Sequence, residues 1–532
     1  MSRRPYVVLA LSVAVAVAVA LVLLWWSGAL GSEELLDPGF AVRVGLPAAR
    51  AVHDVAAAVT VGLLVVCAWC ITPDRGAGDE LSGTSQDAVR LAGSAAVIWL
   101  VSALVVIVLT AASVAGVGVG SPGFSVVLVV FLGQLDLGRA LGVSAILVLL
   151  VAVMAKLAIR WAAVAAAAVV AVVALLPLAL GGHAAGSRSH MNSVDSLAFH
   201  LVASCVWVGG LAAMLVLAGR LGSQLLSAVG RYSTLAGCCF AVVAVSGVTN
   251  ALLRLGSLDG LLSGYGLLVL GKTVALVVLG LAGYTHRRLT MPQLPHRPSL
   301  FRRLAAVEVV VMGATVGLAV ALSRSAPPAT GAEVGPITAL LGFPAPPPLT
   351  PSRYLSSFYP DLLWLTVGVV AAVGYVAAVV RLSRRGVRWP WLRTVSWLVG
   401  CGVLVWVTSG GPGVYGRLHF STHMVQHMAL MSVVPLLWVL AAPLTLALRA
   451  LKPRTDGSLG PRETLLKLVR SPVLRVLAQP LVAAALFVGG LGVFYYTDLL
   501  DLALFTHTGH VLMTAHFLLC LLYTSPSPRD RS

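Results

Sequence analysis

Three histidines at four-residue intervals have the clearest potential for chemistry in this chain. His419, His423 and His427 lie in the run GRLHFSTHMVQHMALM, where a long apolar segment begins. A spacing of four places all three on one face of a helix, each about one turn (~5.4 Å) from the next. An imidazole in hydrocarbon is costly unless something binds it. The three residues therefore predict a ligand site inside a membrane helix.

A second group of histidines begins the last apolar segment, and methionines accompany both groups. Imidazole with thioether is a ligand set suited to Cu(I), whereas zinc sites usually include carboxylate or thiolate. Each methionine taken alone is equally well explained as a gap-filler in helix packing. The second group consists of His507, His510 and His516, and the neighbouring methionines are Met424, Met428 and Met513.

The spacing assigns different roles to these residues. His510 and His516 are six apart, so they project from different faces and need a partner helix to share one ion. His419 is nearest to water and is expected to be an access or capping residue. His423 and His427 are therefore the principal predicted ligands. A lone membrane histidine such as His200 is more often a hydrogen-bonded structural residue, and it is a weaker candidate.

The composition is that of a membrane protein. Of 532 residues, 59% are hydrophobic and 10% are charged. About fourteen apolar runs are long enough to cross a hydrocarbon core of ~30 Å. Alternating strand patterns are absent, so we predict an all-α, polytopic transmembrane bundle. The segment 124–132 is too short to span and is expected to be interfacial or re-entrant. The last three spans are expected at 421–448, 476–496 and 507–523.

The basic residues predict orientation rather than a nucleic-acid partner. The formal net charge is +17. With the N-terminus in the cytoplasm, twenty-five Lys and Arg residues fall in inner segments and eight in outer ones. This is the positive-inside pattern, and anionic membrane lipids account for the charge. On this topology ten of the twelve histidines lie on or near the outer side.

A Pro-rich stretch divides the chain. Residues 326–351 are expected to be an extended extracytoplasmic linker, because proline and glycine there disfavour helix and sheet. We predict a membrane domain of about nine spans at 1–325 and a second of five spans at 352–523. The tail at 524–532 (TSPSPRDRS) is unlike the rest of the chain and is expected to be non-native.

Several polar residues within apolar segments have structural interpretations. Cys67 and Cys70 form a CxxC that is expected to be two buried small side chains, with a Cu(I) or redox role as the minority interpretation. Asp195 is expected to cap a helix beginning at residue 196. Glu308 is expected to pair with Arg302 or Arg303. Lys272 is costly enough in a membrane to require a structural partner or a place in a permeation path.

Both halves of the chain resemble known families. The first resembles the CopD family of copper-resistance membrane proteins, in HLVASCVWVGGLAAML (200–215), YGLLVLGKTVAL (265–276) and FRRLAAVEVV from residue 301. The second resembles CtaG-type cytochrome c oxidase assembly factors, in HFSTHMVQHMALMSVVPLLWVLAAPLTL (419–446) and HTGHVLMTAHFLL (507–519). Together they resemble the fused CopD–CtaG proteins typical of actinobacteria.

The resemblance implies a function in copper handling. It implies copper uptake or transfer by the first half and copper provision for cytochrome c oxidase by the second. It places the metal at His423, His427, His510 and His516, with His200 a weaker candidate. The CtaG-type half should contain about seven spans, so the five counted here predict a C-terminal truncation.

We therefore expect a multi-pass protein of the bacterial plasma membrane that binds copper as Cu(I). We do not expect an enzyme, since ligand exchange suffices for copper transfer. Its expected partners are membrane lipids and either cytochrome c oxidase subunits or a periplasmic copper chaperone. The alternative is a haem-binding redox protein with bis-His ligation, for example by His423 and His510. A pH-gated transporter is a third interpretation, but the chain lacks the intramembrane acidic relay that it would need.

Overall fold

The predicted all-helical class is confirmed. The computed structural model of the protein describes residues 4–31, 37–73, 80–81, 83–180, 189–328, 335–454 and 460–520. Within these ranges the chain forms helices and turns, and its only β feature is an isolated bridge between Glu80 and Arg160. The tail that was expected to be non-native lies outside the described residues.

Among the described residues, twelve helices are long and apolar enough to cross a membrane, and a thirteenth is counted if α22 (Pro480–Tyr496) and α23 (Leu499–Phe505) form one span. These two helices are bent by 75° at their junction. The difference from the expected fourteen lies at the end of the chain. There the described part of α24 (His507–Cys520) has 14 residues, fewer than the ~20 that a span requires.

The chain forms two compact units. The first contains residues 1–187 and 193–333, and the second contains residues 188–192 and 334–532. The first unit comprises α1 (Arg4–Trp26), α2 (Phe40–Trp69), α3 (Gly83–Ala115), α4 (Phe124–Gln134), α5 (Asp136–Leu157), α6 (Trp161–Val173), η1 (Leu176–Leu180), most of α7 (His190–Leu217), η3 (Gly222–Gln224), α8 (Leu225–Leu255), η4 (Leu258–Leu262), α9 (Gly264–Thr285), the π-helix η5 (His286–Thr290), α10 (Met291–Gln293) and α11 (Pro298–Arg324).

The second unit begins with two short helices and then builds a bundle. Besides α22, α23 and α24, it comprises α12 (Pro336–Leu341), α13 (Pro351–Ser356), α14 (Leu362–Ser383), α15 (Trp391–Ser409), α16 (Gly411–Tyr415), α17 (Phe420–Met428), the π-helix η7 (Ala429–Val433), α18 (Val434–Leu440), α19 (Pro443–Ala450), α20 (Pro461–Val469) and α21 (Pro472–Leu477).

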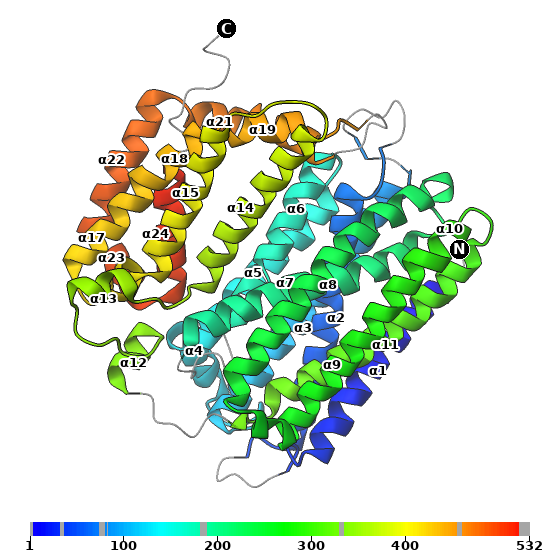
Figure 1. Ribbon diagram of the computed structural model, residues 1–532. Coiled ribbons are helices and arrows are strands. Elements are labelled where there is room, and N and C mark those ends of the chain that lie inside the picture. The colour runs from blue at the N-terminus through cyan, green and yellow to red at the C-terminus, as the bar shows by residue number, and fades with distance from the viewer. Residues whose placement is uncertain are drawn as a thin grey trace. The chain divides into compact units, whose positions relative to one another are not determined.

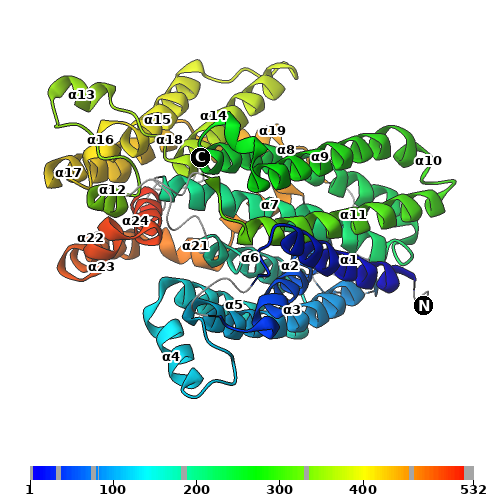
Figure 2. The ribbon, with the colours of Figure 1, turned by 90° about the horizontal axis from the view of Figure 1, so that it is seen from below.

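Small residues bring the helices of the first unit together. The helices α1 and α11 lie side by side in both views (Figures 1 and 2). Gly313 of α11 faces Ser12 of α1, whose hydroxyl donates to the carbonyl of Val309 at 3.1 Å. Glycine permits such close approach of membrane helices, where lipid provides no hydrophobic driving force.

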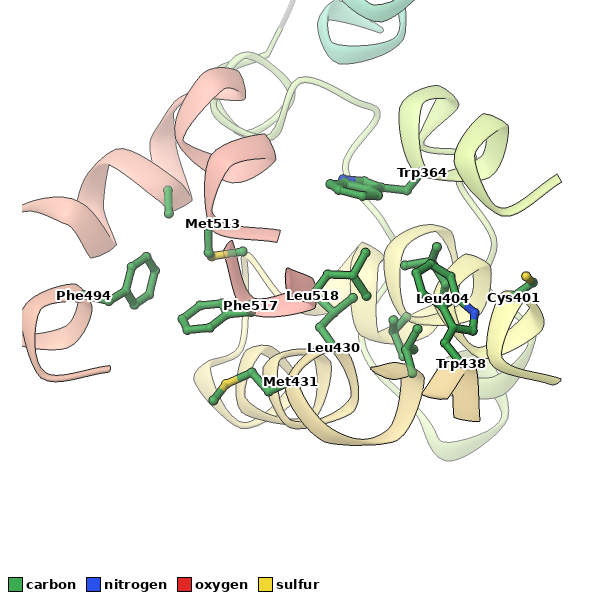
Figure 3. Close-up of a cluster of buried hydrophobic side chains, with 13 residues drawn as sticks. Trp364, Cys401, Leu404, Leu430, Met431, Trp438, Phe494, Met513, Phe517 and Leu518 are labelled. Carbon is green, nitrogen blue, oxygen red and sulfur yellow. The ribbon is translucent and has the colours of Figure 1, made fainter. Parts of the chain in front are cut away.

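The core of the second unit is aromatic and sulfur-rich. Figure 3 shows Met513 and Phe517 of α24 near Phe494 of α22, with Leu430 and Met431 of the π-helix beneath them. All five side chains are buried. This core adjoins the C-terminal end of α17, the helix that carries the histidine ladder (His419, His423 and His427).

The structure corrects several expectations. The Pro-rich stretch is not wholly extended, because α12 forms within it where Pro336 supplies a favourable first helical residue. Asp195 does not cap a helix, since α7 already begins at His190 and buries Asp195 in its second turn. Glu308 does not pair with Arg302 or Arg303. Its Oε1 lies 2.9 Å from Nε2 of His286, and both side chains are largely buried.

Candidate functional site

The histidine ladder lies on α17, immediately before a π-helical turn. His419 is the N-cap residue of α17, and its side chain is exposed. The π-helix η7 follows the ladder, and Pro435 follows η7. The proline ring disfavours an α-helical approach to the carbonyl of Met431, four residues earlier and within η7. Such π-bulges in α-helices occur frequently at functional sites.

His427 is fully buried and has a partner for each ring nitrogen. Its Nε2 lies 3.0 Å from Sδ of Met513, and its Nδ1 lies 2.8 Å from the hydroxyl of Tyr495. The same hydroxyl lies 3.3 Å from Sδ of Met424. Three elements distant in sequence, α17, α22 and α24, therefore meet at one imidazole.

The single hydroxyl proton of Tyr495 allows two arrangements. When Tyr495 donates to Met424, it accepts from Nδ1–H of His427, and Nε2 then carries a lone pair toward Met513. When Tyr495 donates to Nδ1, Nε2–H of His427 donates to Met513 instead. The first arrangement places an unprotonated imidazole nitrogen 3.0 Å from a thioether sulfur. Those are two of the donors that a soft metal ion prefers.

His423 adds a third donor beside this pair. Its ring centroid lies 4.0 Å from that of His427, and the side chain is 2% exposed. Within the described part of the chain, its Nε2 has no hydrogen-bond partner. The same holds for Nε2 of Gln426 and Oγ1 of Thr514, which are also buried. Buried polar atoms are normally paired, so the unpartnered Nε2 of His423 beside His427 has the character of an open ligand position.

Aromatic rings enclose the site. Phe517 and Phe494 lie 4.6 and 5.6 Å from the His427 ring, centroid to centroid, and Tyr495 lies at 6.1 Å. These rings exclude water and lower the local dielectric constant.

His510 lies one turn before Met513 on α24 and lines a separate small cavity. The cavity has a volume of about 20 Å³, room for roughly one water molecule. Its polar walls include Asp361, Thr408 and Arg417. Burial lowers the pKa of Arg417 to about 10, while nearby Asp361 acts in the opposite direction. Arg417 therefore stays cationic at neutral pH.

The other predicted ligands lie outside this cluster. His516 is exposed, and its Nε2 faces Gly490 of α22. Met428 is 44% exposed. His200 lies in the first unit, with Nδ1 3.0 Å from the hydroxyl of Ser246. Within the described ranges, no three His, Cys, Asp or Glu side chains form a group that could hold a metal. The candidate donor set is therefore two imidazoles and a thioether.

A buried histidine of the first unit, His53, is satisfied by its neighbours. His53 is buried in α2, and its Nε2 accepts a hydrogen bond of 3.0 Å from Nε1 of Trp99. Its Nδ1 therefore carries the proton and donates to Asp54 at 2.9 Å. With both nitrogens engaged, His53 has no lone pair left for a metal.

Sequence models of three protein families match this chain. The match to "Copper resistance protein D-like, N-terminal domain" covers residues 35–191, and the match to "Copper resistance protein D" covers 226–322. The match to "Cytochrome c oxidase caa3 assembly factor (Caa3_CtaG)" covers 373–526. The chain joins a CopD-type part to a CtaG-type part. The predicted fusion is thereby confirmed, and His423, His427, His510 and Met513 all lie within its CtaG-type part.

Mycobacterial proteins are among the relatives. An uncharacterized protein of Mycobacterium leprae is 41% identical over 197 residues, and uncharacterized proteins of Mycobacterium bovis and Mycobacterium tuberculosis are 40% identical over 197 residues. Each match covers 36% of this chain and 30% of the relative, so it spans less than a third of the relative's length. No solved structure matches the chain.

Met513 was expected to accompany the histidines, but it was not among the principal predicted ligands. Met513 is three residues after His510, a spacing that places both on one helical face and that was available in the sequence. Tyr495 carried no such signal, because it is an aromatic residue at the end of an apolar helix like many others. Only packing brings it to His427.

Proposed function

We propose that the protein handles copper in a bacterial plasma membrane, taking it up or transferring it and providing it for cytochrome c oxidase assembly. The observation that carries this proposal is the 3.0 Å approach of His427 Nε2 to Met513 Sδ in a buried site beside His423. The descriptions of the matching families, copper resistance and caa3 oxidase assembly, support a copper-related membrane role.

The donor set favours Cu(I) as the cargo. Imidazole nitrogen and thioether sulfur are neutral, polarizable donors that suit Cu(I), whereas zinc usually recruits thiolate or carboxylate. The aromatic enclosure leaves little room for the water ligands that harder ions retain. His423, His427 and Met513 would hold the ion, and no bond-making catalysis is required of the chain.

The charge of Arg417 favours ligand exchange over diffusion of free ions. Arg417 and His510 line the same cavity, so a bare cation passing through it would meet a positive guanidinium. A docked protein that hands copper from its own ligands to His510 and His427 avoids this repulsion. A periplasmic copper chaperone or an oxidase subunit has the required chemistry.

Anaerobic Cu(I) titration of the purified full-length protein against a chromogenic chelator tests the proposal. We expect the double variant H423A/H427A to lose the tight Cu(I) site and M513L to weaken it by about tenfold or more. The matched control M428L should leave affinity unchanged, because Met428 is 44% exposed and away from the cluster.

Three outcomes would contradict the proposal. Unchanged copper stoichiometry in H423A/H427A would remove these histidines from the site. Tighter binding of zinc than of copper would assign a different cargo. A Soret absorption band in the purified protein would favour the haem alternative.

A further inference from the structure

The first unit contains two cations within its membrane helices that the copper site does not use. Lys272 is eight residues from the start of α9, about 12 Å along the helix axis. It is half-buried, and its charged neighbour is Arg254 in the last turn of α8. Within the described part of the chain, neither residue forms a hydrogen bond or an ion pair. Neighbouring cations without a counterion are costly where burial lowers the dielectric constant.

A polar ladder on α8 ends at Arg254. Ser246, Asn250 and Arg254 occur at intervals of four on α8 and therefore share one face. Nδ2 of Asn250 donates to the carbonyl of Ser246 at 2.9 Å, which fixes the orientation of the amide. Its Oδ1 is consequently an acceptor, and it is buried without a partner among the described residues. The ladder thus offers one guanidinium and one vacant acceptor, and Lys272 of α9 supplies an ammonium within electrostatic reach of Arg254.

His200 of α7 borders the same region, and its surroundings disfavour a metal cation. Ser246 donates its hydroxyl proton to the carbonyl of Val242 at 2.6 Å, so it accepts from Nδ1–H of His200 at 3.0 Å. Lys272 and Arg254 both act electrostatically on His200. A metal ion bound at His200 would be repelled by both.

We propose that α7, α8 and α9 form a binding site for a phosphate group that carries or adjoins a hydroxyl. Arg254 binds the phosphate through two parallel N–H donors, and Lys272 supplies a second positive charge. Oδ1 of Asn250 accepts a hydrogen bond from the hydroxyl. Two sources share this chemistry, a phospholipid headgroup such as phosphatidylglycerol and free hydrogen phosphate.

Binding at this site differs from the non-specific attraction between basic residues of membrane proteins and anionic lipids. Arg254 and Lys272 lie on the predicted outer side, whereas the positive-inside pattern concentrates basic residues on the other side. The unpartnered amide oxygen also requires a hydrogen-bond donor, which a zwitterionic choline headgroup lacks. The proposal therefore predicts selectivity for the hydroxyl as well as for the charge.

The test uses the purified, delipidated full-length protein. Native mass spectrometry would measure binding of phosphatidylglycerol and phosphatidylcholine, and the thermal unfolding midpoint would be followed with added inorganic phosphate. We expect K272Q and R254Q each to bind phosphatidylglycerol roughly tenfold or more weakly, as for loss of a charged hydrogen bond. N250L should lose the preference for phosphatidylglycerol over phosphatidylcholine. The control is K156Q, which removes the other lysine of the first unit and should change neither.

The lipid-binding and phosphate measurements together distinguish a phospholipid headgroup from free phosphate as the ligand. A phosphate-dependent rise in the unfolding midpoint that K272Q abolishes, without lipid selectivity, assigns free phosphate. In the absence of lipid and phosphate, K272Q should unfold at the same temperature as the wild type or at a higher one, because it removes an uncompensated cation. A loss of binding in K272Q then cannot be caused by unfolding. The proposal would be overturned if K272Q and R254Q bound phosphatidylglycerol and inorganic phosphate as tightly as the wild type does. Cu(I) affinity should stay unchanged in all variants.

Discussion

At the scale of single residues, the candidate copper site depends on which ring nitrogen of His427 carries the proton. His427 can present a lone pair at Nε2 only when Nδ1 carries the proton, and Tyr495 is the group that can hold it there. Such second partners of metal-binding histidines fix the tautomer and the ring orientation. Tyr495 is therefore a positioning residue.

Replacement of Tyr495 by phenylalanine should lower Cu(I) affinity by about 10–100-fold, because the tautomer is no longer held. Anaerobic chelator competition would measure it. The adjacent residue provides a matched control, since Tyr496 is 92% exposed and Y496F should bind copper like the wild type. Equal affinities of Y495F and Y496F would show that the hydroxyl has no role.

At the scale of helices, close packing in the first unit depends on a pair of glycines. A Cβ atom at Gly209 of α7 would lie 1.6 Å from the carbonyl oxygen of Ala58, and one at Gly62 of α2 would lie 1.9 Å from the carbonyl carbon of Gly209. Both obstacles are backbone atoms, so a rotamer change cannot relieve them. The two helices must separate if either glycine gains a side chain.

We expect G209A to reduce the free energy of unfolding by about 2 kcal/mol or more, the cost of overpacking a dense interface. Thermal unfolding of the detergent-solubilised protein would measure the change. In G283A, nothing lies within 4 Å of the added methyl group, and stability should be kept or slightly raised. If both variants unfolded like the wild type, α2 and α7 would not pack as described.

At the scale of the whole molecule, the uneven distribution of basic residues predicts how the chain is oriented. The helix α14 separates Ser352, near the end of the Pro-rich stretch, from Arg385, in a strongly basic segment. Both residues are exposed. The positive-inside pattern places Ser352 outside the cell and Arg385 in the cytoplasm.

Cysteine labelling in intact cells tests this orientation. In a background with the exposed Cys238 replaced by serine, S352C should react with a membrane-impermeant maleimide, and R385C should react only after the cells are permeabilised. The opposite pattern would place the N-terminus outside the cell and the histidine ladder on the cytoplasmic side, the reverse of the prediction.

The sequence alone determined the features that depend on local periodicity. Apolar length predicted membrane helices, and four-residue spacing placed His423 and His427 on one face, where their rings are 4.0 Å apart. Tertiary packing decided which faces meet. Met513 and Tyr495 reach His427 across 86 and 68 residues, and Glu308 reaches His286 rather than an arginine of its own helix. A helix's sequence specifies the direction of its side chains around its own axis, but the partner of each face depends on how all the helices pack together.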